Sequence, residues 1–117
     1  MAESGIYGGW VSHENHSGKD NLVGFIVVRR AADELEVLNL AVAPECRRRG
    51  VAGLLLAEAV REGRDLGARS VWLEVRASNE IALKFYNARG FRVAGGRPKY
   101  YRNPDDDAVT LTAAIEP

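Results

Sequence analysis

The chain has 117 residues, of which 46% are hydrophobic and 27% are charged, and its formal net charge is zero. This length suits one small folded core, so we expect residues 1–117 to form a single domain. A neutral chain lacks the positive field that attracts nucleic acid or anionic membranes, and we expect neither as a partner. It has no apolar run of membrane-spanning length. With one cysteine and no N-terminal signal-peptide pattern, a cytoplasmic location is expected.

The first third of the chain predicts an antiparallel meander. Three runs rich in β-branched and aromatic residues read as strands, at residues 6–12, 22–30 and 37–42. The polar connection after the first run contains His13 and His16, but no further ligand accompanies them, so we expect no metal site. Pro44 ends the third strand because proline cannot donate a hydrogen bond to a neighbouring strand.

Three arginines and Gly50 follow that proline, and an apolar run with helical spacing comes next. The run predicts a helix over residues 50–66 that ends at Gly67. The residues expected to face the sheet are Val51, Leu55, Ala59 and Leu66. A strand that turns into a helix leaves the first N–H groups of the helix unpaired, and these groups favour a phosphate or pyrophosphate. A solvated basic helix start is the alternative.

The second half of the chain predicts two more core elements and two closing strands. Residues 70–76 read as a strand, so that strand, helix and strand form a parallel crossover. Residues 79–90 predict a second helix, capped by Ser78 or Asn79. The closing strands are expected at residues 91–94 and 109–115, with a loop or hairpin connection between them. The predicted fold is therefore α+β, with a mixed, mostly antiparallel sheet and a central parallel strand pair joined by a helix.

Two side chains in these elements suit proton transfer. Glu74 stands in an otherwise apolar strand, so it faces a cleft or pairs with Arg76 or Arg69. In a cleft, desolvation would raise its pKa toward neutrality, as a general base requires. Tyr86 lies on the inner stripe of the second helix, either as a core aromatic or as a general acid at the end of a ligand tunnel. We interpret Cys46 as a loop residue that can be exposed, since no base partner is indicated.

Three segments of the chain resemble the GNAT acetyltransferases, and among them the RimI-type N-terminal acetyltransferases. RRRGVA at residues 47–52 matches the [QR]xxGx[GA] pyrophosphate signature. VWLEVRASN at residues 71–79, followed by FYNARGF at residues 85–91, is similar to the RimI-type strand and helix. RPKYYRNPDDDAVTL from residue 97 is similar to the tyrosine-bearing hairpin of the family. The likeness covers about residues 22–115 and implies the α/β three-layer GNAT fold.

This resemblance implies a role for each matching residue. Glu74 falls on the general base and Tyr86 on the general acid, while Tyr100 and Tyr101 fall on the substrate-side hairpin. The residues implied to bind acetyl-CoA, the only cofactor that we expect, are Leu40, Ala41, Val42, Arg47, Arg48, Arg49, Gly50, Val51, Ala52, Gly53 and Asn79.

The implied activity is direct transfer of acetyl from acetyl-CoA to a protein N-terminal α-amine, in that family typically an alanine on a small-subunit ribosomal protein. A GNAT enzyme for a small-molecule amine or a lysine, or a CoA-binding module with little turnover, remains open. The strand and helices that usually precede the first strand of this family have no counterpart in the sequence. Residues 6–12 would then be an exposed edge, and we expect a homodimer that covers it.

Overall fold

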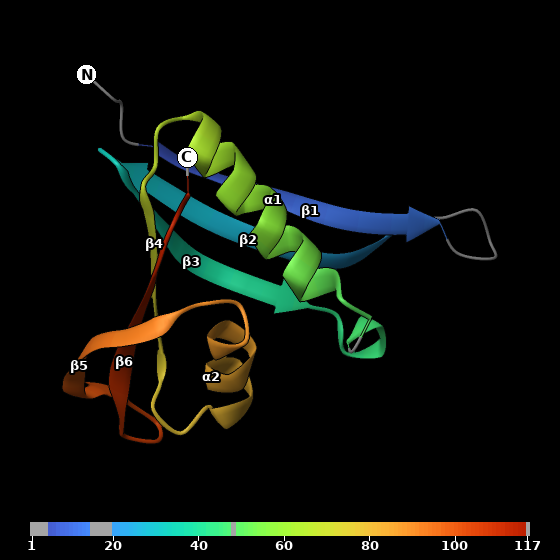
Figure 1. Cartoon of the computed structure of the whole chain (residues 1–117). Helices are drawn as coiled ribbons and strands as arrows, with labels where there is room; N and C mark the ends of the chain where they lie inside the picture. The colour runs from blue at the N-terminus through green and yellow to red at the C-terminus, as the bar shows by residue number, and fades with distance from the viewer. Residues whose placement is uncertain (1–4, 15–19, 48, 117) are drawn as a thin grey trace.

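The sheet of this protein is mixed, as the sequence predicts. The structure is a computed structural model and describes residues 5–14, 20–47 and 49–116. In the described part, six strands form one sheet in the order β1-β2-β3-β4-β6-β5 (Figure 1). Strands β3 and β4 are parallel, and every other neighbouring pair is antiparallel. The predicted α+β class and its central parallel pair are confirmed.

The elements follow one another in the predicted order. The N-terminal meander consists of β1 (Gly5–Glu14), β2 (Asp20–Ala31) and β3 (Glu34–Val42). A 3-10 turn, η1 (Pro44–Cys46), then leads into helix α1 (Val51–Asp65). The remaining elements are β4 (Ser70–Arg76), α2 (Glu80–Asn87), β5 (Arg92–Tyr101) and β6 (Asp106–Ala114).

Helix α1 is bounded by two glycines in the left-handed region. Gly50 precedes it with a φ of 78° and Gly67 follows it with a φ of 96°, conformations that a side chain would disfavour. Its buried residues are Leu55, Leu56, Ala59 and Gly63. The prediction that Leu66 faces the sheet is wrong, because Leu66 follows the last helical turn and is 53% exposed.

Both helices cover the same face of the sheet. Buried residues of α1 and α2 join a single core cluster with Val71 and Leu73 of β4. Figure 1 shows α1 lying across β1, β2 and β3, with α2 beside β4. Because side chains alternate along a strand, the half-buried Trp72 and Glu74 point to the opposite face. In the described residues, no helix is both long and apolar enough to cross a membrane.

Strand β5 is longer than predicted. Residues 95–101 were expected to form a connection, but they continue the strand and pair with β6 through the pair Tyr101–Asp106. Two register shifts interrupt the pairing, between Val93 and Gly95 and between Arg97 and Tyr101. Such bulges on an edge strand accommodate Pro98 and the glycines, which would break a central strand.

Candidate active site

The central feature of the site is the divergence of β3 from β4. The two strands pair only where residues 34–36 face residues 70–72. Beyond these pairs, β3 continues toward η1 while β4 runs toward α2 (Figure 1). On its other side β3 stays paired with β2, and a register shift leaves Leu38 as an extra residue. Within the described part of the chain, residues 37–42 therefore have no strand partner on the β4 side, where their backbone groups can hydrogen-bond a ligand.

The three β3 residues predicted to contact acetyl-CoA lie in this diverging part. Leu40, Ala41 and Val42 are half-buried and pair with residues 24–26 of β2. The chain then turns sharply, and the turn is fixed by hydrogen bonds. The N–H of Ala43 donates to the carbonyl of Val23 at 2.7 Å, which holds the end of β3 against β2.

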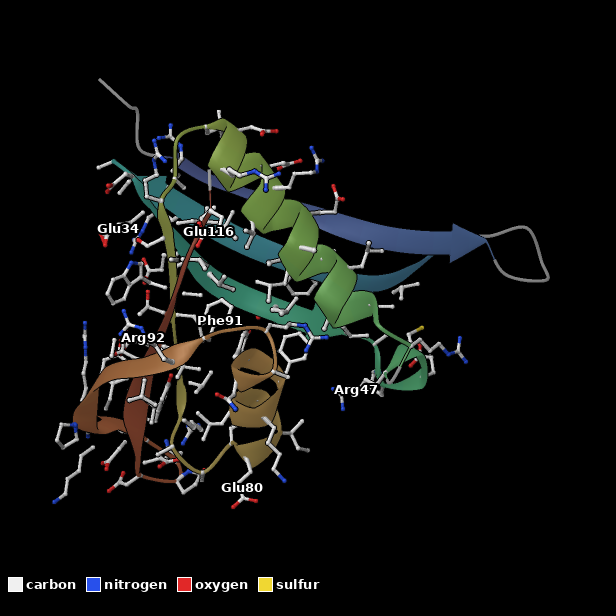
Figure 2. All side chains as sticks on the ribbon, viewed as in Figure 1. Glu34, Arg47, Glu80, Phe91, Arg92 and Glu116 are labelled. Carbon is white, nitrogen blue, oxygen red and sulfur yellow. The ribbon has the colours of Figure 1, made fainter. Side chains whose placement is uncertain are left out.

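The turn from η1 into α1 gathers most of the predicted phosphate-binding residues. None of the described side chains caps α1, so the N–H groups of its first turn remain available to an anion. Arg47 and Arg49 are exposed at this turn, and the Nε of Arg47 donates to the carbonyl of Val42 at 3.3 Å (Figure 2). The other predicted members are Gly50, Val51, Ala52 and Gly53. Arg48 lies outside the described residues.

Cys46 is buried at this turn, so the expectation of an exposed thiol is wrong. Its side chain is 4% exposed. The N–H of Cys46 donates to the carbonyl of Ala43 at 2.8 Å, and this tight turn directs the residue inward. Cys46 thus behaves as a small apolar residue beneath the arginines.

Glu74 pairs with an arginine that the sequence did not suggest. Its Oε2 lies 3.4 Å from the Nε of Arg97 in β5, and in the described part of the chain neither Arg76 nor Arg69, the predicted partners, forms an ion pair with it. The geometry is that of an ion pair without an aligned hydrogen bond, because Oε2 is buried and has no hydrogen-bond partner. With 22% of its side chain exposed, Glu74 is a half-buried carboxylate with acceptor capacity to spare.

A hollow of about 410 Å³ adjoins Glu74 on the face of the sheet opposite the helices. Its lining contains both arginines and glutamates, together with one large aromatic side chain. The residues around it include Arg29, Glu34, Glu36, Trp72, Arg97 and Thr110. Arg29 and Glu36 form an ion pair across neighbouring strands. The side chains that line the hollow are therefore mostly charged, and Trp72 adds an apolar surface among them.

Tyr86 lies on the helix side of β4 and is 7% exposed. Its ring packs edge-on against Phe85, with centroids 5.0 Å apart, and against Phe91, at 5.2 Å. Phe91, labelled in Figure 2, follows α2 and leads into β5. Burial raises the pKa of the Tyr86 phenol above its usual value. The phenol is therefore protonated at neutral pH and can serve as a proton donor.

Asn79 is the N-cap of α2, which decides between the two predicted caps. Its Oδ1 accepts a hydrogen bond from the N–H of Ala82 at 3.1 Å. Ser78 has a different role, since its hydroxyl donates to Oδ2 of Asp106 at 2.5 Å. The oxygen of Asn79 is thus engaged in the cap, which leaves its amide NH₂ as the group for a ligand.

The two hairpin tyrosines differ in their surroundings. Their rings meet edge-on at 5.2 Å, but Tyr100 is 49% exposed whereas Tyr101 is half-buried. Burial, and next the negative charge of Glu74, raise the pKa of Tyr101. The guanidinium of Arg97 lies 5.2 Å from the ring of Tyr100, so Arg97 touches both the hairpin and the carboxylate.

The expectation of no metal site at His13 and His16 is tested only in part. His16 lies outside the described residues. Within the described ranges, no group of three or more His, Cys, Asp or Glu residues is placed to hold a metal ion.

Comparison with known proteins decides the family. The model of the acetyltransferase (GNAT) family matches residues 3–91, from β1 through α2. The chain belongs to the GNAT acetyltransferase family. The phosphate turn and the divergence of β3 from β4 both lie within the matched residues.

Known GNAT relatives resemble most of this chain. It is 37% identical over 90 residues to the ribosomal protein bS18-alanine N-acetyltransferase of Haemophilus ducreyi, an alignment that covers 77% of this chain and 62% of the relative. The crystal structure of the ribosomal-protein-S18-alanine N-acetyltransferase from Escherichia coli matches with a TM-score of 0.77 and 28% identity, over 92% of this chain and 70% of that one. Nourseothricin acetyltransferase matches with a TM-score of 0.78 and 29% identity, over 90% and 64%. The predicted GNAT fold is confirmed.

Sequence reasoning missed Arg97, and it considered Arg76 only as a partner of Glu74. Arg97 pairs with Glu74 across the sheet, and Arg76 binds the turn that follows Tyr101. Both contacts join residues far apart in the sequence, so only the register of the β5–β6 hairpin could have indicated them.

Proposed function

We propose that this GNAT chain transfers the acetyl group of acetyl-CoA to the α-amine of a protein N-terminus. The observation that carries this proposal is the divergence of β3 from β4, which opens a gap with Glu74 on one strand and residues 40–42 on the other. The names of two relatives, which state an alanine of ribosomal protein S18 as acceptor, support a peptide N-terminus as substrate. The likeness covers 62% of the length of the Haemophilus ducreyi relative.

In this proposal acetyl-CoA is a co-substrate held by backbone groups and arginines, and no metal takes part. The uncapped first turn of α1 and residues Arg47, Arg48 and Arg49 bind the pyrophosphate. The unpaired edge of residues 40–42 binds the pantetheine arm through backbone hydrogen bonds. The amide NH₂ of Asn79 contacts the cofactor beside α2.

Glu74 is the proposed general base. Acting through one water, it takes a proton from the acceptor's α-ammonium group, whose pKa of about 8 requires only a modest base. The freed lone pair attacks the thioester carbonyl carbon, and a C–N bond forms. A backbone N–H near Val42 donates to the resulting oxyanion. The C–S bond then breaks, the electron pair leaves with sulfur, and the positively charged nitrogen loses its second proton to solvent to give the neutral amide.

Tyr86 is the proposed general acid. It gives its phenolic proton to the departing thiolate of CoA and is later reprotonated from solvent. The buried phenol is protonated before the thiolate develops, although its raised pKa makes it a weaker acid than a free tyrosine. Glu74 and Tyr86 lie on opposite faces of β4, so proton removal and proton donation act from opposite sides of the gap.

The test is CoA release from acetyl-CoA with an alanine-starting peptide. Glu74→Gln and Tyr86→Phe are each expected to lower turnover by about 10²-fold or more. Glu58→Gln is the matched control, since Glu58 is an exposed glutamate of α1 paired with Arg61, and it should turn over normally. Full activity in Glu74→Gln would contradict the role of the base. Acetylation of lysine side chains or small amines, without acetylation of the peptide α-amine, would contradict the proposed acceptor.

We also propose that the chain forms a homodimer across β1. In the described sheet β1 is an edge strand, and an edge offers unpaired N–H and C=O groups to a second copy. Light scattering at micromolar concentration tests this proposal, and a monomer there would refute it.

A further inference from the structure

Arg76 makes a two-pronged contact with the turn between β5 and β6. Its Nη1 donates to the carbonyl of Pro104 at 2.8 Å, and its Nη2 donates to the carbonyl of Arg102 at 3.0 Å. Both acceptors belong to residues 102–105, which connect the two strands. The planar fork of a guanidinium is suited to binding two carbonyls at once, whereas an ammonium group is a single point charge.

The guanidinium of Arg76 also contacts the β5–β6 hairpin through the ring of Tyr101. It lies 4.6 Å from the centroid of the Tyr101 ring, within cation–π range. Arg76 and Glu74 are two residues apart in β4, so their side chains share one face of the strand. Tyr101 thus lies over the strand face that carries the proposed base.

Separate contacts hold the start of β6. The N–H of Ala77 donates to the carbonyl of Asp107 at 2.9 Å, and the hydroxyl of Ser78 donates to Asp106. These bonds anchor the strand, whereas Arg76 binds the preceding turn, which the pair Tyr101–Asp106 closes. The proposed mechanism gives Arg76 no part, although it is the residue of β4 that joins this turn to the base-bearing strand.

We propose that Arg76 is a positioning residue for the acceptor, which holds the β5–β6 turn against β4 and thereby places Tyr101 over the face of β4 that carries Glu74. This inference rests on the proposed function, since it takes Tyr101 to be part of the acceptor site. Loss of the fork would release residues 102–105 and let the ring of Tyr101 move away from that face of β4. The phosphate turn lies at the end of β3, so acetyl-CoA binding should be spared.

The kinetic test titrates the peptide and acetyl-CoA separately in Arg76→Ala and Arg76→Lys. Arg76→Ala is expected to raise the KM for the peptide about tenfold, as the loss of charged hydrogen bonds implies, with the KM for acetyl-CoA unchanged. Arg76→Lys keeps the charge and the aliphatic part of the side chain, so its KM for the peptide should lie between those of the wild type and Arg76→Ala. This variant provides the test if Arg76→Ala does not fold. Arg61→Ala, which removes an exposed arginine of α1, is the matched control.

Amide hydrogen exchange over residues 99–107 provides a readout that needs no activity. Exchange should be faster in Arg76→Ala and unchanged in Arg61→Ala. Unaltered exchange, or faster exchange with an unchanged peptide KM, would overturn the proposal, as would an equal rise in both KM values. If the wild-type chain acetylates no peptide, the proposed function fails and the acceptor role falls with it. The exchange data then still decide whether Arg76 holds the turn.

Discussion

Gly63 of α1 and Leu35 of β3 meet so closely that the helix approaches the sheet only because position 63 has no side chain. A Cβ at Gly63 would lie 2.9 Å from Cδ2 of Leu35. Leu35 is 0% exposed and belongs to the core cluster, so its side chain has no space into which to move. This contact fixes the distance of α1 from the strand that carries the proposed cofactor-binding edge.

Gly63→Ala is therefore expected to destabilise the protein. Overpacking of a well-filled core costs about 1–3 kcal/mol, and the better helix propensity of alanine offsets roughly 1 kcal/mol of that cost. The measurement is the free energy of unfolding by urea denaturation. A variant as stable as the wild type would show that Leu35 can repack.

Gly53→Ala is the same substitution in the same helix, but it is not expected to destabilise the protein. A Cβ at Gly53 would lie 2.8 Å from Nη2 of Arg89, an exposed side chain that can move at the loss of its exposed contacts with Phe85. Stability should be unchanged or rise by about 0.5 kcal/mol. The KM for acetyl-CoA should rise, because the new methyl group stands at the proposed pyrophosphate turn. A loss of stability equal to that of Gly63→Ala would contradict this account.

Asn79 permits the cap and the proposed cofactor contact to be separated. Asn79→Ala removes the cap of α2 and should lower stability by about 1 kcal/mol. Asn79→Asp keeps an oxygen acceptor for the N–H of Ala82, so its stability should stay near that of the wild type. Both variants lack the amide NH₂, and both should raise the KM for acetyl-CoA. An unchanged KM in Asn79→Asp would leave Asn79 with a structural role alone.

The raised pKa of Tyr86 predicts a loss of stability in alkali. In the unfolded chain tyrosine loses its proton near a pKa of about 10, whereas the buried phenol still holds it. The contribution of Tyr86 is therefore complete below about pH 10 and is lost as the pH rises through the folded-state pKa. Tyr86→Phe should show a shallower decline of unfolding free energy between about pH 9 and about pH 11. Parallel declines in the two proteins would contradict the prediction.

Local patterns were sufficient to predict the order of the elements. The helical spacing after Gly50, the glycine at position 67 and the alternation in residues 70–76 are all signals within a few residues of the feature that they specify. The phosphate turn was predictable for the same reason, because its arginines, glycine and helix start are contiguous. The resemblance supplied the proposed roles of Glu74 and Tyr86.

Features that depend on distant partners were not predictable. The Glu74–Arg97 pair and the extended β5 both follow from the register of β5 on β6, which no local pattern encodes. Glycine and proline in residues 95–98 indicate a loop when read locally, yet pairing with β6 keeps them in a strand. The burial of Cys46 likewise depends on the geometry of a turn, whereas the polar residues next to it in the sequence indicate an exposed loop.

The burial of Cys46 has a practical consequence for the CoA-release assay proposed above. It is the one cysteine of the chain, and the fold encloses it. A chromogenic thiol reagent added to the native protein would thus react with liberated CoA against a low background from the protein itself. Without substrates, the same reagent would react with Cys46 only when the turn before α1 opens. The rate of colour formation would then measure how often the phosphate-binding end of the molecule opens.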